Sequence, residues 1–343
     1  MYRRSFLKEI TLFAGACLVP RIHYGMEEAT IMTVAGPIKS SDLKFTLSHE
    51  HILVDFIGAE QVNKNRYDAN EVYNTALPYL VDAEKRGCNT FVDCTPGYLG
   101  RDVQILKRLS VASGMHIICP TGYYGAAKEK YVPKHAYTET AEQLADRWIS
   151  EWRKGIEGTG IKPGLIKTGV DKGPLTSVQK KLITAAALTH LATGLTIGVH
   201  TGDGAAAKEQ LEILASKGVA PSARIWIHAQ NEKDLQYHID AAQRGSWVSF
   251  DGVSKDSAKD HISFLQAMKR EQLLHAVLVS QDAGWYHVGE PGGGNFNPYH
   301  YIFTDFIPAL KENGFTQQDV DTLFIANPAK AFTVGVRTTA KNK

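Results

Sequence analysis

Six residues that could bind metal stand at the ends of short apolar segments of the sequence. They are four histidines, one lysine and one aspartate: His49, His51, Lys167, His200, His228 and Asp282. If these segments are parallel strands, all six side chains gather at one rim of a sheet. Four imidazoles and a carboxylate can hold two divalent ions. The lysine is the unusual member of the set.

The spacing of the histidines favours a role as metal ligands. His49 and His51 are separated by one residue, and in a strand residues i and i+2 project from the same face, so both can bind one ion. Glu50 then points the other way and is expected to be structural. A lone histidine in an apolar segment is more often a satisfied core residue. The pair, and the repetition of the pattern at His200 and His228, favours ligands.

The aspartate and the lysine need separate arguments. Asp282 ends the last apolar segment, where it could bind metal and accept a proton, or could instead cap the segment that follows. Lys167 follows Leu165 and Ile166 and would be a buried cation, repelled by nearby divalent ions. Reaction with CO2 would convert its amine into a carbamate, an anion with two oxygens. In that form the side chain could bridge two ions.

The elements that must position these residues follow an alternating pattern. Strand-like segments cover residues 45–51, 89–94, 116–121, 164–168, 195–200, 224–228, 247–251 and 276–282. Helical patterns cover residues 70–86, 139–155, 178–193, 205–217, 232–244 and 257–272. Glycines at 87, 114, 194, 218, 245 and 314 fit the ends of helices. Alternation of this kind implies parallel pairing with right-handed crossovers.

Eight such units favour a single-domain (β/α)8 TIM barrel of the α/β class. A doubly wound open sheet is the alternative. The candidate ligands end the first, fourth, fifth, sixth and eighth strand segments. An open sheet would spread these strands along a flat array, whereas a closed barrel brings their ends around one mouth. The ligand pattern therefore favours the barrel.

The composition is that of an ordinary globular protein. The chain has 343 residues, 43% hydrophobic content, 22% charged content and a formal net charge of +2, which suits one large domain. It has no run of Lys and Arg typical of nucleic-acid or anionic-membrane binding, so a small-molecule substrate is predicted. After residue 20 no apolar stretch is long enough to predict a membrane span.

Residues 1–25 are interpreted as an export signal, and residues 26–343 as the barrel domain. Arg3 and Arg4 are followed by Ser-Phe-Leu-Lys and an apolar stretch, as in twin-arginine signals. An amphipathic helix is the alternative, and a lipid attachment motif at Cys17 fits less well. The prediction is a periplasmic or otherwise exported protein. The other cysteines, at 88, 94 and 119, lack metal-ligand spacing, and no disulfide framework is predicted.

Taken together, the motifs resemble the phosphotriesterase family of the amidohydrolase superfamily, whose members are (β/α)8 barrels with a binuclear metal centre. The resemblance covers residues 30–335, from VAGP at 34–37 through TLSHEH at 46–51 to NPA at 327–329. It implies that His49, His51 and Asp282 hold the more buried ion, and His200 and His228 the more exposed one. It also implies that Lys167, as N6-carboxylysine, and a hydroxide bridge the two ions. Zn²⁺ is the first expectation, with Co²⁺ or Mn²⁺ as alternatives, and a homodimer is suggested.

The reaction implied is attack by the bridging hydroxide, with Asp282 accepting the proton. Tyr124 stands where phosphotriesterases have tryptophan and lactonases have tyrosine, unless it only packs at the barrel mouth. Gly252 departs from both the phosphotriesterase and the lactonase pattern, which have His or Arg directly after Asp251, and Asn231 stands where the phosphotriesterase proton relay has a carboxylate. We therefore expect a hydrolase of a lactone or related carboxylic ester. A phosphotriesterase is the alternative, and a non-catalytic metal-binding barrel is the alternative of another class.

Three residues are expected to contact the substrate: Tyr124, Asp251 and Trp285. Trp285 lies in the glycine-rich segment 284–295 that follows Asp282. A long loop over a barrel mouth is where substrate specificity generally resides. Trp285 could form a wall of the pocket, or it could pack this loop down.

Overall fold

The computed structural model describes residues 29–339. The twin-arginine-like segment and Cys17 lie outside this range, so export stays a prediction. The other three cysteines, Cys88, Cys94 and Cys119, are free and buried. Within residues 29–339, no helix combines the length and the apolar character needed to cross a membrane.

Parallel strands form the centre of the molecule, as the sequence predicted. The eight barrel strands of the described residues are β3 (Thr46–Val54), β4 (Thr90–Asp93), β5 (His116–Ile118) continued by β6 (Pro120–Thr121), β7 (Leu165–Val170), β8 (Thr196–Thr201), β9 (Arg224–Ile227), β10 (Trp247–Phe250) and β11 (Val277–Val279). Neighbours pair in parallel register in sequence order. Each strand lies within two to three residues of its predicted segment, apart from β11, which is shorter.

The strands close into a barrel. β5 and β6 are one run of chain interrupted at Cys119, and they join the two sheets on one side. On the other side, the Asp282 N–H donates to the His49 carbonyl oxygen over 3.1 Å, next to β11. The chain then continues as β12 (Gly284–His287), which pairs in parallel with β3. The open-sheet alternative is therefore wrong.

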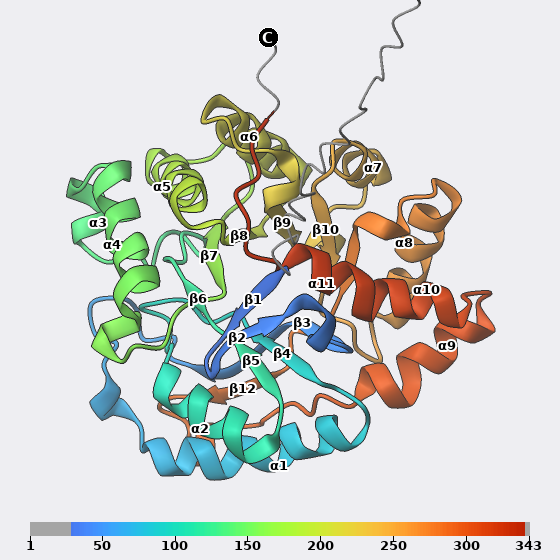
Figure 1. The fold of residues 1–343 in the computed structure, drawn as a ribbon, viewed down its shortest axis with the longest axis horizontal. Coiled ribbons are helices and arrows are strands. Elements are labelled where there is room, and N and C mark those ends of the chain that lie inside the picture. The colour runs from blue at the N-terminus through green and yellow to red at the C-terminus, as the bar shows by residue number, and fades with distance from the viewer. Residues whose placement is uncertain (1–28, 340–343) are drawn as a thin grey trace, which may run out of the picture.

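Helices form the outer layer around the strands, as Figure 1 shows. The longer ones are α1 (Ala69–Lys85), α2 (Val103–Ser113), α4 (Ala141–Lys154), α5 (Ser177–Thr193), α6 (Gly204–Ser216), α7 (Leu235–Gln243) and α8 (Ala258–Arg270). The shorter ones are α3 (His135–Thr138), α9 (Ile307–Glu312), α10 (Gln317–Asp321) and α11 (Asn327–Ala331). Polar side chains start several of them, and Thr140 and Thr176 each form a capping box. Gly114 and Gly194 end α2 and α5 in the left-handed conformation, as expected.

An antiparallel hairpin, which was not predicted from the sequence, lies across one end of the barrel (Figure 1). It consists of β1 (Thr30–Thr33) and β2 (Gly36–Lys39). After β1, the Val34 N–H donates to the Ile117 carbonyl oxygen over 2.8 Å. Ile31 packs with barrel-lining side chains such as Leu165 and Leu278. The end of the barrel where the strands begin is thus closed by apolar packing, and the candidate site lies at the opposite end.

Candidate metal centre

The fold brings the six predicted ligand residues to the carboxyl ends of the barrel strands. β3 carries two of them, β7 and β8 one each, His228 follows β9 directly, and Asp282 lies three residues after the end of β11. His49, His51 and Asp282 form the tightest group, because their ligand atoms all lie within 4.8 Å of one another. Oδ1 of Asp282 lies 3.5 Å from Nε2 of His49 and 3.2 Å from Nε2 of His51.

The other predicted ligands adjoin this group. The rings of His200 and His228 have centroids 4.4 Å apart, and the His228 ring lies 5.0 Å from that of His49. Nε2 of His228 is 3.9 Å from Oδ2 of Asp282, so this carboxylate faces histidines from both groups. Lys167 is 2% exposed. Within residues 29–339 no carboxylate forms an ion pair with it.

Two ligand residues have left-handed backbones although neither is glycine. The φ angles are 61° at His228 and 54° at Asp282. Such a conformation costs an L-residue about 1–2 kcal/mol, and it turns the chain sharply where each strand ends. Backbone strain of this kind persists only where the surrounding structure holds it, often at functional sites. Here it directs both side chains toward the barrel axis and toward the histidines of β3.

Neighbouring side chains fix the orientation of the imidazoles. Nδ1 of His51 lies 2.8 Å from Oγ1 of Thr95. Nδ1 of His228 contacts the Asp251 carboxylate, which also accepts a 3.0 Å hydrogen bond from the His228 backbone N–H. The second oxygen of Asp251 is 3.5 Å from Nδ1 of His49. Partners on the ring nitrogens that face away from a metal set the tautomer and leave Nε2 for the ion.

Asp251, which was expected to contact the substrate, lies against His228 and His49. Its side chain is fully buried, and it also accepts a 2.8 Å hydrogen bond from Ser249. Asp251 follows β10 directly. Its side chain is the hydrogen-bond acceptor for the backbone N–H of His228, the residue after β9. Asp251 thus orients His228 and lies beside His49, and its contact with a substrate stays a prediction. Thr95 was missed, although it follows a predicted strand as the ligands do.

Burial also sets the protonation of the imidazoles. It lowers the pKa of His49 and of His200 well below the ordinary histidine value, so both rings are neutral at pH 7. Burial acts in the same direction on His228, but its contact with Asp251 outweighs this effect and raises the pKa. Neutral imidazole is the form that binds metal.

Unpartnered atoms show that the donor set fits a divalent cation. Nε2 of His49 and Oδ1 of Asp282 are buried and have no hydrogen-bond partner in the structure. Burying polar atoms without partners is unfavourable, and because these two atoms lie 3.5 Å apart within one ligand group, they fit a position that a cation completes. Nitrogen and oxygen donors of this kind suit zinc and similar ions. By contrast, an unmodified lysine amine adds a positive charge to this cluster.

Glu50 has the structural role that its strand position predicted. It is fully buried, and burial raises the pKa of its carboxyl group to about 8. Its oxygens accept hydrogen bonds from the Ser280 hydroxyl at 2.7 Å, the Gln281 N–H at 3.0 Å and the Ala283 N–H at 2.6 Å. Glu50 therefore holds the segment on both sides of Asp282 against β3.

We expect Glu50→Ala to lower the free energy of unfolding by about 3 kcal/mol or more, because buried donors would lose their acceptor. Metal content should fall in parallel, since the Asp282 segment would lose its support. Denaturant unfolding and metal analysis measure the two effects. Glu50→Gln, which keeps the size and one acceptor oxygen, is the matched control and should lose less. Wild-type stability in Glu50→Ala would contradict this role.

Four aromatic side chains line the site on one side, and we call them the aromatic arc: Tyr124, Tyr131, Phe56 and Trp285. Successive ring centroids along the arc are 5.9, 6.0 and 5.7 Å apart. Its ends touch two ligands, with Tyr124 5.0 Å from the ring of His200 and Trp285 4.1 Å from that of His51. The arc forms an apolar wall beside the metal centre.

The two predicted aromatic residues are both at the site. The Tyr124 ring centre is 5.3 Å from Nζ of Lys167. The Trp285 indole N–H donates to the Asp282 carbonyl oxygen over 2.7 Å, so this side chain packs its loop down as well as facing a ligand. Phe56 and Tyr131 were not predicted from the sequence, because both lie in loops without a periodic pattern.

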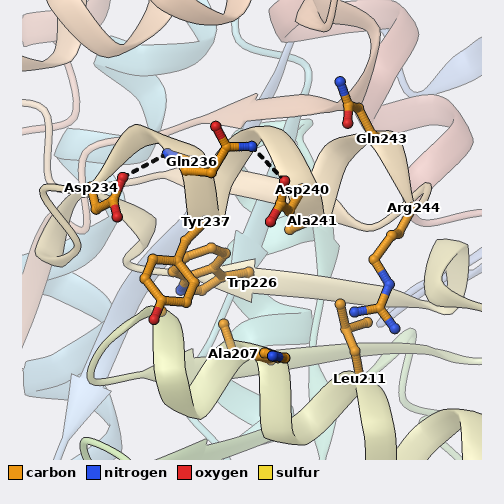
Figure 2. Close-up of a pocket in the computed structure, with 12 residues that line it drawn as sticks. Ala207, Leu211, Trp226, Asp234, Gln236, Tyr237, Asp240, Ala241, Gln243 and Arg244 are labelled. Atoms are coloured by element: carbon orange, nitrogen blue, oxygen red, sulfur yellow. Dashed lines mark hydrogen bonds between the residues drawn. The ribbon is translucent and has the colours of Figure 1, made fainter.

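A separate groove on the outside of the barrel contains none of the six candidate ligands. It lies between α6 and α7, has a volume of about 500 Å³ and is lined by residues such as Leu211, Trp226 and Arg244 (Figure 2). Trp226 is fully buried at its base. The chemistry of the ligand cluster therefore belongs to the barrel mouth and not to this groove.

Two solved structures have the same fold. One is described as a mutant of organophosphorus hydrolase from Deinococcus radiodurans, with a TM-score of 0.78, 26% identity, and coverage of 89% of this chain and 97% of that one. The other is described as molecular engineering of organophosphate hydrolysis activity from a weak promiscuous lactonase template. It has a TM-score of 0.79, 27% identity, and coverage of 88% of this chain and 99% of that one.

Curated relatives are similar over nearly their whole lengths. The phosphotriesterase homology protein of Escherichia coli (strain K12) is 32% identical, with 84% of this chain and 97% of the relative covered. The aryldialkylphosphatase of Saccharolobus solfataricus is 28% identical, with 86% of this chain and 96% of the relative covered. The model of the family described as "Phosphotriesterase family" matches residues 29–332. The chain therefore belongs to the phosphotriesterase family.

Proposed function

We propose that this protein is a binuclear metal-dependent hydrolase that acts on a lactone or a related carboxylic ester. The observation that carries the proposal is the convergence of the six ligand residues at one end of the barrel, with His49 Nε2 and Asp282 Oδ1 buried and unpartnered. A site that only stabilised the fold would not need to leave these atoms without partners.

In this proposal one ion is held by His49, His51 and Asp282, and the other by His200 and His228. Zinc is the first candidate, with cobalt or manganese as alternatives. When bound, such ions would polarise the scissile carbonyl group and ionise a water molecule near neutral pH. Burial holds the His49 and His200 imidazoles in the neutral, ligating form, and the aromatic arc shields the site on one side.

Lys167 is proposed to link the two ions as N6-carboxylysine. Burial lowers the pKa of its amine, which favours the neutral form that can attack CO2. The amine nitrogen bonds to the carbon of CO2 and loses one proton, giving a carbamate with one negative charge and two oxygens. This anion replaces an unpaired buried cation by a group that two divalent ions attract.

Asp282 is proposed as the proton acceptor. Its carboxylate lies 3.2 Å from Nε2 of His51 and 3.9 Å from Nε2 of His228, and its side chain is 22% exposed. A carboxylate between the ligands and the open mouth can take a proton from the attacking water and pass it to the leaving alcohol. Asn231 and Gly252 supply no further carboxylate or base along this route.

The substrate class is inferred from the residues around the site. Tyr124 borders His200 and Lys167, which agrees with the tyrosine of lactonases at this position. Gly252 has no side chain, and the Gln230 amide lies close to it. A proton relay would need a basic side chain at this position. A solved neighbour described as a lactonase template supports the same choice. The name of the similar aryldialkylphosphatase supports phosphotriester hydrolysis as the second candidate.

A panel of substrates on metal-reconstituted protein tests the proposal. We expect kcat/KM for the best lactone or carboxylic ester to exceed that for diethyl 4-nitrophenyl phosphate by about 100-fold or more, since the proton relay is missing. N-acetyltaurine serves as an amide control, because it is named in similar hydrolases. A preference for the phosphotriester or for the amide would overturn the proposed substrate class.

A further inference from the structure

A second, polar surface borders the metal centre. An open cavity of about 640 Å³ adjoins His200. The lining residues are Lys128, Asp171, Lys172, His200, Gly202 and Asn231. His200, which lines this cavity, is also the ligand that Tyr124 of the aromatic arc contacts. A substrate held at the metal centre can therefore contact both surfaces.

The cavity has an excess of positive charge. Lys128 and Lys172 are exposed, and neither ammonium group has an ion-pair or hydrogen-bond partner among residues 29–339. Asp171 contributes the one negative charge, but its oxygens are engaged. They accept hydrogen bonds from the N–H groups of Ala127 at 2.9 Å and Lys128 at 3.1 Å, and from the Gln179 amide at 3.0 Å. The two ammonium groups are thus the available charges.

The backbone that presents Lys128 is strained. Ala127, Lys128 and Glu129 have φ angles of 53°, 55° and 62°, three successive left-handed residues without a glycine. Each costs about 1–2 kcal/mol relative to the right-handed form. The hydrogen bonds from this turn to Asp171 hold it in place. Strain that the surrounding structure maintains is typical of functional loops.

Lys172 is also on a firmly packed segment. A Cβ atom at Gly202 would lie 2.4 Å from the Lys172 backbone nitrogen, so this segment packs directly on the turn that follows His200. The Gly173 N–H donates to Asp203 over 3.1 Å and fixes the segment further. Both lysines therefore extend from positioned backbones beside one metal ligand.

We propose that the substrate carries a fixed negative charge outside its scissile ester, and that Lys128 and Lys172 recognise this charge. The inference rests on the proposed hydrolase function and narrows its substrate class to anionic lactones or esters. The charge is a carboxylate or a phosphate, which two ammonium groups attract alike. The apolar part of the substrate lies against the aromatic arc, on the other side of His200.

The test compares pairs of esters in which one member carries an additional carboxylate group. Mono(4-nitrophenyl) glutarate is anionic and 4-nitrophenyl butyrate is its neutral counterpart. A second pair is 5-oxotetrahydrofuran-2-carboxylate and γ-butyrolactone. In each pair we expect the wild-type protein to prefer the anion, mainly through a lower KM. Raising the salt concentration should reduce this preference, because exposed charges are screened within about 8 Å at 0.15 M salt.

The variant for the test is Lys128→Met/Lys172→Met. We expect it to lower kcat/KM for the anionic esters about tenfold, the combined effect of two exposed charge pairs, and to leave the neutral esters nearly unchanged. Lys128→Arg/Lys172→Arg should keep the preference. Lys154→Met is the matched control, since Lys154 is an exposed lysine at the end of α4, on the opposite face of the barrel.

The binding of inhibitors that are not hydrolysed tests the same inference without measuring turnover. Glutarate should bind the wild-type protein more tightly than butyrate, and the double methionine variant should lose the difference. Competition by glycerol 2-phosphate beside glutarate distinguishes a phosphate from a carboxylate. Equal rates on the anionic and neutral esters, or a parallel loss on both in the double variant, would overturn the inference while the hydrolase proposal stood. Absence of hydrolysis across both pairs would instead contradict the hydrolase itself.

Discussion

Removal of divalent metal is expected to lower the rate of ester hydrolysis by about 10⁴-fold or more, because metal-generated hydroxide and carbonyl polarisation would both be lost. The chain offers no replacement nucleophile at the site, as far as residues 29–339 show. Cys94 is fully buried in the barrel, and burial raises the pKa of its thiol well above the ordinary value. His49 and His200 are uncharged without metal and have only weak basicity at their buried positions.

The experiment is dialysis against a chelator, followed by stepwise addition of Zn²⁺, Co²⁺ or Mn²⁺. Activity should return over two equivalents of metal, and elemental analysis should find two ions in the restored protein. Circular dichroism of the metal-free protein provides the control for retained fold. Full activity in a preparation shown to contain no metal would contradict the proposed mechanism and would favour a different use of the barrel mouth.

Lys167→Met is expected to lower both the metal content and the rate, the rate by about 10³-fold, because the bridging anion would be lost and cannot be replaced by a thioether. The fold should survive. In the metal-free protein the amine is buried and unpaired, so a methionine of similar length removes an unfavourable buried polar group, and the free energy of unfolding measured without metal should stay constant or rise.

A spectroscopic signature separates this role from simple packing. Wild-type protein prepared with ¹³C-labelled bicarbonate should give a carbamate signal in its ¹³C spectrum, and Lys167→Met should give none. The same signal in Lys154→Met, whose residue is exposed on α4, serves as the control. Unchanged metal content and activity in Lys167→Met would show that another group links the two ions.

The sequence predicted the strands and the ligand positions because both depend on local features. An apolar segment followed by a histidine or aspartate is visible in the chain, and the end of a parallel strand has a known place in a barrel. His49 and His51 could be assigned to one face by their spacing alone. Gly114 and Gly194 were recognised in advance because a left-handed helix end favours glycine.

What the sequence left open depends on contacts between distant segments. The contact of Asp251 with His228 could not be predicted, because Asp251 follows β10 and the backbone N–H that it accepts from belongs to His228, at the end of β9. Phe56 and Tyr131 meet only after the barrel has closed. Lys128 gave no signal either, since its left-handed turn contains no glycine and is held by Asp171, 43 residues away.

The hydrogen bonds of Glu50 have a consequence for the order of folding. They join the first barrel strand to the segment after the last one, across sequence separations of 230 to 233 residues. Contacts this distant form after local ones, because closing a long loop costs more entropy than closing a short one. The tightest ligand group spans the same seam, from His49 to Asp282. A truncated or half-synthesised chain therefore lacks this group, and only the complete barrel can acquire it.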